Sequence, residues 1–189
     1  PTAAAILPSL LIMWFFHARD VFREPPRVLW TTFFLGLLTV PVVYLLAKPL
    51  SYLQLEDLPR SYARAFALGF VHSALPKGLL TFAIVFGYAQ RNPAFDEPAD
   101  GVVYGVAASL GFATLENVLH VREGDLSTAI VRALSAVPNH AFTGVIMGYF
   151  VGQAKFRPPE RGKLLTAALF WPIVAHGLHD AGRLAWKYS

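Results

Sequence analysis

The sequence is 189 residues long, 55% hydrophobic and 15% charged, with a formal net charge of +4. Soluble domains are nearer one quarter charged, so this composition excludes an ordinary soluble domain and favours a membrane-embedded protein. The absence of cysteine excludes disulfides and thiolate metal sites, and the basic residues lie in short loops that lack the aromatic pattern of a nucleic-acid-binding surface.

Six apolar stretches predict six membrane-spanning helices, because a helix needs about 20 apolar residues to cross the hydrocarbon core and lipid offers the backbone no other partner. The predicted spans are residues 1–17, 28–47, 62–90, 100–121, 127–154 and 164–186. Charges with Pro or Gly clusters mark the loops between them. The expected fold is therefore all-α, a polytopic transmembrane bundle in the lipid bilayer, forming a single domain over residues 1–189.

Positive charge orients this predicted bundle. Loops two and four carry only Lys48, Arg60 and Arg122. Loops one, three and five carry more, namely Arg19, Arg23, Arg27, Arg91, Lys155, Arg157, Arg161 and Lys163. The positive-inside rule therefore predicts that loops one, three and five face the cytoplasm.

The third span contains Lys77 near its middle, after Leu75-Pro76 and five residues beyond His72. A lysine in hydrocarbon is costly unless a counter-charge pairs with it, and Glu116 is the candidate partner. The alternative is that Lys77 extends along a kinked helix toward the membrane interface.

An ionisable residue lies in each of the last three spans: Glu116 in the fourth, His140 in the fifth and His176 in the sixth. Such a group marks function by default, because it is costly unless it faces a partner or a water-filled cavity. Counted from the predicted span ends at 1.5 Å per residue, the three lie roughly 7, 10 and 9 Å from the same membrane face. We therefore expect their side chains to meet.

Each of the three ionisable residues has a neighbour in sequence that bears on its predicted role. His120 shares a helix face with the glutamate, Pro138 breaks or kinks the fifth span, and Asp180 lies where it would orient the imidazole of the sixth. The alternatives are structural: a protonated glutamate that bonds a neighbouring helix, a packed histidine, and His179 with Asp180 solvated among the headgroups.

Carboxylate and imidazole ligands without thiolate favour zinc or a similar divalent metal, here at Glu116, His140 and His176. Zinc-dependent hydrolysis also needs a general base near the attacking water. Other acidic residues are expected in loops or at span ends: Glu24, Glu56, Asp57, Asp96, Glu97, Asp100, Glu123, Asp125 and Glu160.

Several motifs occur in the order found in the PrsW-type intramembrane protease family, which is related to CAAX-prenyl endopeptidases, and the sequence resembles that family over nearly its whole length. The matching segments are Arg19-Asp20 with residues 23–27, residues 95–105, residues 111–117, Arg132 with His140 and Gly144, and His176 with Asp180. The resemblance implies a metal or catalytic core of Glu116, His140 and His176. It further implies that Asp180 and Asn117 orient ligands or stabilise an oxyanion, and that Arg132 pairs with an acid or binds substrate.

The sequence departs from the family at its hallmark in the third span, a glutamate pair followed by a lysine three positions after the second glutamate. If Lys77-Gly78 is the family's lysine and glycine, the pair falls on Ser73 and Ala74. If Leu75-Pro76 precedes the pair, it falls on Lys77 and Gly78, and Thr81 replaces the lysine. In the family this pair is implicated in activating water or binding the metal. The chain is therefore expected to be impaired, as a natural pseudoprotease or as a version changed at the site.

The resemblance implies intramembrane proteolysis in the bacterial cytoplasmic (inner) membrane, with a single-span membrane protein such as an anti-sigma factor as substrate and no nucleic acid as partner. A catalytically inactive adaptor that binds a substrate helix without cutting it is the first alternative. A small transporter that uses the same buried residues is the second, although the sequence lacks the paired discontinuous segments that transporters often show.

Overall fold

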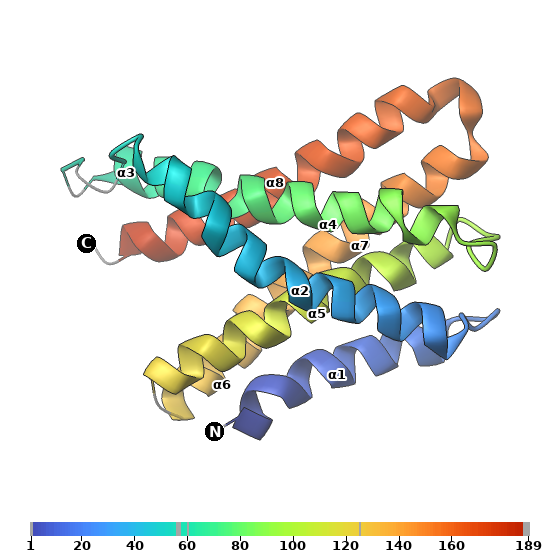
Figure 1. Cartoon of the computed structure of the whole chain (residues 1–189), viewed down its shortest axis with the longest axis horizontal. Coiled ribbons are helices and arrows are strands. Elements are labelled where there is room, and N and C mark those ends of the chain that lie inside the picture. Colours follow the sequence, from blue (N-terminus) through green and yellow to red (C-terminus); the bar gives the residue numbers. More distant parts are fainter. Residues whose placement is uncertain (1, 56–57, 60, 125, 187–189) are drawn as a thin grey trace.

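The computed structural model describes residues 2–55, 58–59, 61–124 and 126–186, and within them it is helical without strands, which confirms the all-α prediction (Figure 1). Nine segments build the bundle: α1 (Thr2–Arg19), α2 (Pro26–Ser51), α3 (Tyr62–Ala67), the π-helical turn η1 (Leu68–Ala74), α4 (Leu75–Gly87), α5 (Asp100–Glu123), α6 (Leu126–Leu134), α7 (Ala136–Phe156) and α8 (Arg161–Ala185). Short 3₁₀ turns, η2 (Ala89–Arg91) and η3 (Pro158–Glu160), follow α4 and α7.

Within the described residues, four of the six predicted spans are long and apolar enough to cross a membrane by length and composition. They are Thr2–Arg19, Pro26–Leu46, Tyr62–Arg91 and Asp100–Arg122. The last predicted span, 164–186, corresponds to α8. These helices make the chain a multi-pass membrane protein.

The break or kink predicted at Pro138 is confirmed, and it divides the span predicted over 127–154 into two helices. The helix breaks at Ser135, so that α6 ends at Leu134 and α7 begins at Ala136. Pro138 explains the break, because proline has no N–H to donate and its ring crowds the carbonyl four residues earlier, which is that of Leu134. The break separates Arg132 on α6 from His140 on α7.

Helix α5 is the central element of the bundle. Its spanning window is 72% buried, the largest share among the four candidate spans. It packs against α1, α2 and α7, and the largest core cluster joins residues of these four helices. A helix that is covered on nearly every side holds its side chains in fixed directions, which is what a site residue such as Glu116 needs.

Glycines let α5 and α7 approach closely. A Cβ added at Gly105 would lie 2.3 Å from the carbonyl oxygen of Gly144, and one at Gly148 would lie 1.9 Å from that of Gly101. Small residues four apart on both helices are the usual means of close helix packing in membranes. This contact fixes α7 against α5 and sets the distance between His140 and Glu116.

Helix α8 packs on α7 and on η1. The approach to η1 is also close, since a Cβ at Gly69 would lie 2.7 Å from the backbone nitrogen of Ala181. Helix α8 therefore presents His176 and Asp180 to both neighbours, and both residues are buried.

Candidate functional site

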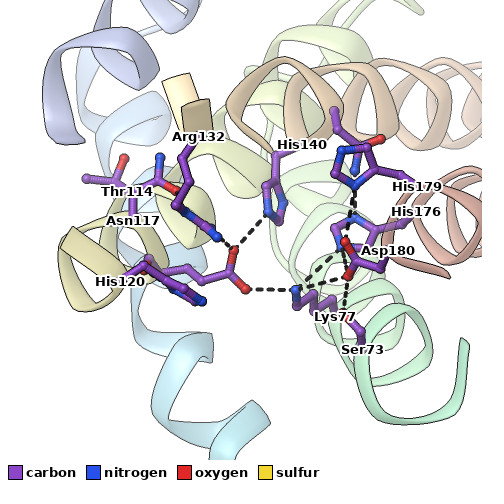
Figure 2. A network of polar contacts seen from close by, with 12 residues as sticks. Ser73, Lys77, Thr114, Asn117, His120, Arg132, His140, His176, His179 and Asp180 are labelled. Atoms are coloured by element: carbon purple, nitrogen blue, oxygen red, sulfur yellow. Dashed lines mark hydrogen bonds and ion pairs between the residues drawn. The ribbon is translucent and has the colours of Figure 1, made fainter. Parts of the chain in front are cut away.

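Polar side chains from five helices, most of them buried, meet inside the apolar bundle (Figure 2). The structure brings the three predicted residues to this place: Glu116 from α5, His140 from α7 and His176 from α8. All three are at most 9% exposed. The rings of His140 and His176 lie edge to face, with centroids 4.8 Å apart. The network is completed by Lys77 of α4, Arg132 of α6 and Asp180 of α8.

The Glu116 carboxylate has a cation on each oxygen. Lys77 Nζ lies 2.7 Å from Oε1, and Arg132 Nη2 lies 2.6 Å from Oε2. His140 Nε2 lies 3.3 Å from the same Oε2. A buried carboxylate is stable only when its charge is paired, so these contacts explain how Glu116 persists in the bundle. The predicted pairing of Lys77 with Glu116 is confirmed.

Arg132 also fixes the residue next to Glu116. Its Nε donates to Asn117 Oδ1 at 2.6 Å, while its Nη2 holds Glu116. Asn117 is 1% exposed. One guanidinium therefore orients two consecutive side chains of α5, a geometry that the planar donor fork of arginine allows.

Asp180 organises the second half of the network. Its Oδ2 lies 3.3 Å from His176 Nε2 and accepts a hydrogen bond from Ser73 Oγ, and its Oδ1 lies 3.1 Å from His179 Nδ1. The predicted relation between His176 and Asp180, four residues apart on one helix face, is present. The alternative of mere solvation is wrong for Asp180, which is buried, while His179 stays partly exposed and contacts Asp180.

Lys77 joins the two halves. Besides Glu116, its Nζ lies 3.4 Å from His176 Nε2 and 3.8 Å from Asp180 Oδ2 (Figure 2). The ammonium group therefore lies among the donors that were predicted to hold a metal. Lys77 does not extend toward an interface, as the alternative required.

One carboxylate and two imidazoles are a donor set that zinc accepts. The ligand atoms of Glu116, His140 and His176, however, are not gathered as closely as those of another group. Among the described residues, the group of three with all ligand atoms within 4.8 Å of one another consists of Asp20, Glu24 and Asp100. A metal between Glu116, His140 and His176 therefore requires a local rearrangement in which Lys77 withdraws. The donor chemistry fits, and the groups that now occupy the Glu116 carboxylate are Lys77 on Oε1 and Arg132 on Oε2.

The positions of the missing glutamate pair also face this network. Ser73 contacts Asp180, and Ala74 is fully buried beside His140 and His176. Both end the π-helical turn η1, and such turns occur frequently at functional sites. At Gly78, by contrast, an added Cβ would lie 2.5 Å from Cγ1 of Ile173, so a side chain there requires the Ile173 side chain to shift. The geometry favours the register with the pair at Ser73 and Ala74.

Two small cavities adjoin the network. One of about 20 Å³ is lined by residues that include Ala74, Thr81 and His140, and one of about 30 Å³ by residues that include Glu116, His120 and Asp180. Each is large enough for a water molecule, which needs roughly 10–15 Å³. The site therefore combines ionised side chains with room for the second reactant of a hydrolysis.

Sequence reasoning missed Asn139, which lies 3.3 Å from Nδ1 of His176, although the Pro-Asn-His run was a usable signal for it. Ser73 was named as a candidate position of the glutamate pair, but its hydrogen bond to Asp180 was not predicted. His120 turns toward its own helix, where its Nδ1 lies 2.8 Å from the Glu116 carbonyl oxygen.

Comparison with known proteins gives one consistent answer. The model of the PrsW family of intramembrane metalloproteases matches residues 24–189. Protease PrsW of Geobacillus kaustophilus is 35% identical, covering 98% of this chain and 82% of the relative. Protease PrsW of Bacillus subtilis is 35% identical, covering 94% of this chain and 80% of the relative. Protease PrsW of Clostridioides difficile is 29% identical, covering 93% of this chain and 76% of the relative. No solved structure matches.

Proposed function

This chain belongs to the PrsW family of intramembrane metalloproteases, and we propose that it hydrolyses a peptide bond of a membrane-anchored protein at the site around Glu116, His140 and His176. The observation that carries the proposal is the meeting of these three side chains and Asp180, from three helices, in one buried polar network beside small cavities. The proposed setting is the bacterial inner membrane. The proposed substrate is a single-span protein such as an anti-sigma factor.

Each residue has a proposed role that follows from its contacts. Glu116, His140 and His176 would hold zinc or a similar divalent metal, which when bound supplies a Lewis acid that polarises the scissile carbonyl. Asp180 orients the His176 imidazole, as carboxylates next to ligating histidines commonly do. Asn117 holds Arg132, and Arg132 holds Glu116, so Asn117 orients a ligand rather than facing the reacting atoms.

We further propose that hydrolysis is impaired in this chain. Ser73 and Ala74 carry no carboxylate that could accept a proton from water, and the carboxylates of Glu116 and Asp180 are engaged by cationic or hydrogen-bonding partners. A general base must lie within hydrogen-bond reach of the water that it activates. Of the two positions proposed for the glutamates, Ala74 lines the cavity beside His140 and His176, and Ser73 contacts Asp180.

The direct test restores the glutamates and measures cleavage of a single-span reporter in membranes. The Ser73→Glu/Ala74→Glu chain is expected to cleave the reporter, while the Lys77→Glu/Gly78→Glu chain stays inactive because of Ile173. Ser73→Gln/Ala74→Gln is the matched control, with similar volume and no carboxylate. Cleavage by the glutamine control as strong as by the glutamate chain would refute the role assigned to the missing base.

One observation favours a second function, an inactive adaptor. The Lys77 ammonium, paired with Glu116 and close to His176 and Asp180, gives the network internal charge balance without a metal. A scaffold with this arrangement would hold a substrate helix without cutting it. If a folded Ser73→Glu/Ala74→Glu chain binds the reporter and zinc but leaves the reporter intact, the adaptor is the better account.

A further inference from the structure

A second buried polar cluster lies at another end of the molecule. Asp20 and Glu24 belong to the segment between α1 and α2, and Asp100 is the first residue of α5. In Figure 1 the α1–α2 connection and the loop before α5 lie at the same end of the bundle. Asp100 is sixteen positions before Glu116 on α5, about 24 Å along the helix at 1.5 Å per residue. The cluster is therefore separate from the site around Glu116, and a role for it is independent of the proposed proteolysis.

The three carboxylates converge although they repel one another. Each offers an oxygen, and these three oxygens all lie within 4.8 Å of one another. Glu24 is 2% exposed and Asp100 is 0% exposed. The ion pairs found among the described residues all lie around Glu116 and Asp180, so none of them compensates this charge. Buried carboxylates in such a group need a cation or a proton between them.

The hydrogen bonds of the cluster leave ligand positions open. Asp100 Oδ2 accepts the backbone N–H groups of Asp96 and Glu97, both at 2.7 Å, which fixes the orientation of that carboxylate. Glu24 Oε2 accepts the Tyr104 hydroxyl. Asp100 Oδ1 and Asp20 Oδ2 are buried and have no hydrogen-bond partner. An acceptor oxygen buried without a partner is costly, so orphan oxygens on two adjacent carboxylates point to a missing positive group.

The electrostatics agree with this geometry. Burial, followed by the nearby Asp100 carboxylate, raises the pKa of Asp20, against the opposing backbone hydrogen bonds from Glu24 and Phe22 and the weaker influence of His17. Burial raises the pKa of Glu24 to about 8, against the opposing hydrogen bond from Tyr104. The ionised cluster is therefore unfavourable by itself, and a bound cation would remove the repulsion.

We propose that Asp20, Glu24 and Asp100 bind a hard divalent cation, such as Mg²⁺ or Ca²⁺, which ties the α1–α2 connection to the start of α5. An all-oxygen carboxylate set favours these ions over the softer zinc, which prefers nitrogen and sulfur ligands. The cation stabilises the bundle, because it links the entry of α2 to the helix that α1, α2 and α7 surround.

The test uses Mn²⁺ as a spectroscopic probe on the full chain in detergent after treatment with EDTA. The wild-type chain is expected to bind Mn²⁺ in competition with Mg²⁺ or Ca²⁺, and Asp20→Asn and Glu24→Gln to bind it at least about tenfold more weakly. Asp96→Asn is the matched control, because its side chain is exposed and its backbone N–H still reaches Asp100. His140→Ala is expected to leave this binding unchanged, which separates the two sites.

Thermal unfolding supplies a second readout in case Glu24→Gln folds poorly. Mg²⁺ or Ca²⁺ should raise the Tm of the wild type and of Asp96→Asn, and should raise that of Asp20→Asn much less. Mn²⁺ affinity that is equal in the wild type and Asp20→Asn overturns the proposal. A Tm of the wild type that Mg²⁺, Ca²⁺ and Mn²⁺ all leave unchanged also overturns the proposal, since the carboxylates would then be balanced by a shared proton.

Discussion

Lys77 Nζ lies 2.7 Å from Glu116 Oε1, so a lysine of α4 and a glutamate of α5 form a buried ion pair at the centre of the site. The same ammonium lies 3.4 Å from His176 Nε2. It thus contacts two of the three residues that we propose as metal ligands. The behaviour of this chain toward metal should therefore be controlled by Lys77 as much as by the ligands.

Lys77→Met should tighten zinc binding at least about tenfold, because it removes a positive charge that a metal must displace while it keeps the length of the side chain. The measurement is a zinc titration of the EDTA-treated chain in detergent. Lys163→Met, an exposed lysine at the start of α8, is the control and should not change the affinity. Equal affinity in Lys77→Met and the wild type would show that the ammonium does not compete with metal.

Arg132→Met should destabilise the fold by about 3–5 kcal/mol, because it leaves Glu116 Oε2 and Asn117 Oδ1 buried without their strongest partner. Lysine at this position should rescue only part of the loss, since a point charge cannot bond both side chains as a planar guanidinium does. Reversible unfolding in mixed micelles gives the free energy. Arg157→Met, at an exposed arginine after α7, should be near neutral, and a similar loss in both variants would mean that Arg132 has no special role.

Gly105→Ala should lower the free energy of unfolding by about 1–3 kcal/mol. The new methyl group would meet the Gly144 carbonyl oxygen at 2.3 Å and push α7 away from α5. The same displacement should weaken zinc binding, since it moves His140 relative to Glu116. Gly182→Ala on α8 is the matched control, because nothing lies within 4 Å of the added carbon. Helix propensity predicts that this variant is slightly more stable than the wild type. If Gly105→Ala is as stable as Gly182→Ala, the close glycine contact does not position the site.

Much of this arrangement was predictable from the sequence, for reasons that are specific to membranes. Uncharged stretches of helical length gave the fold class. The cost of ionisable groups in hydrocarbon singled out Glu116, His140, His176 and Lys77, and their depths along the spans predicted that the first three would meet. The structure brings them together.

Other features depend on how helices are rotated and bent, which apolar stretches do not encode. Helix α5 is buried on nearly every side, so its sequence does not show which neighbour Asn117 faces. Pro138 predicted a break or kink in the fifth span, but the sequence did not show that α6 would end at Leu134 and α7 begin at Ala136, because apolar residues continue on both sides. Glu24 was correctly placed in a loop and Asp100 at a span end, yet their burial arises from a loop folding onto a distant helix.

The most direct test of the central claim is the zinc bound per chain after dialysis, compared among the wild type, His140→Ala, His176→Ala and His120→Ala. His120 lines the same cavity, but its Nδ1 lies within hydrogen-bond distance of the carbonyl oxygen of its own helix, so it serves as the matched control. We predict that His140→Ala and His176→Ala each lose zinc while His120→Ala retains it. Zinc retention at the wild-type level in both His140→Ala and His176→Ala would contradict the account.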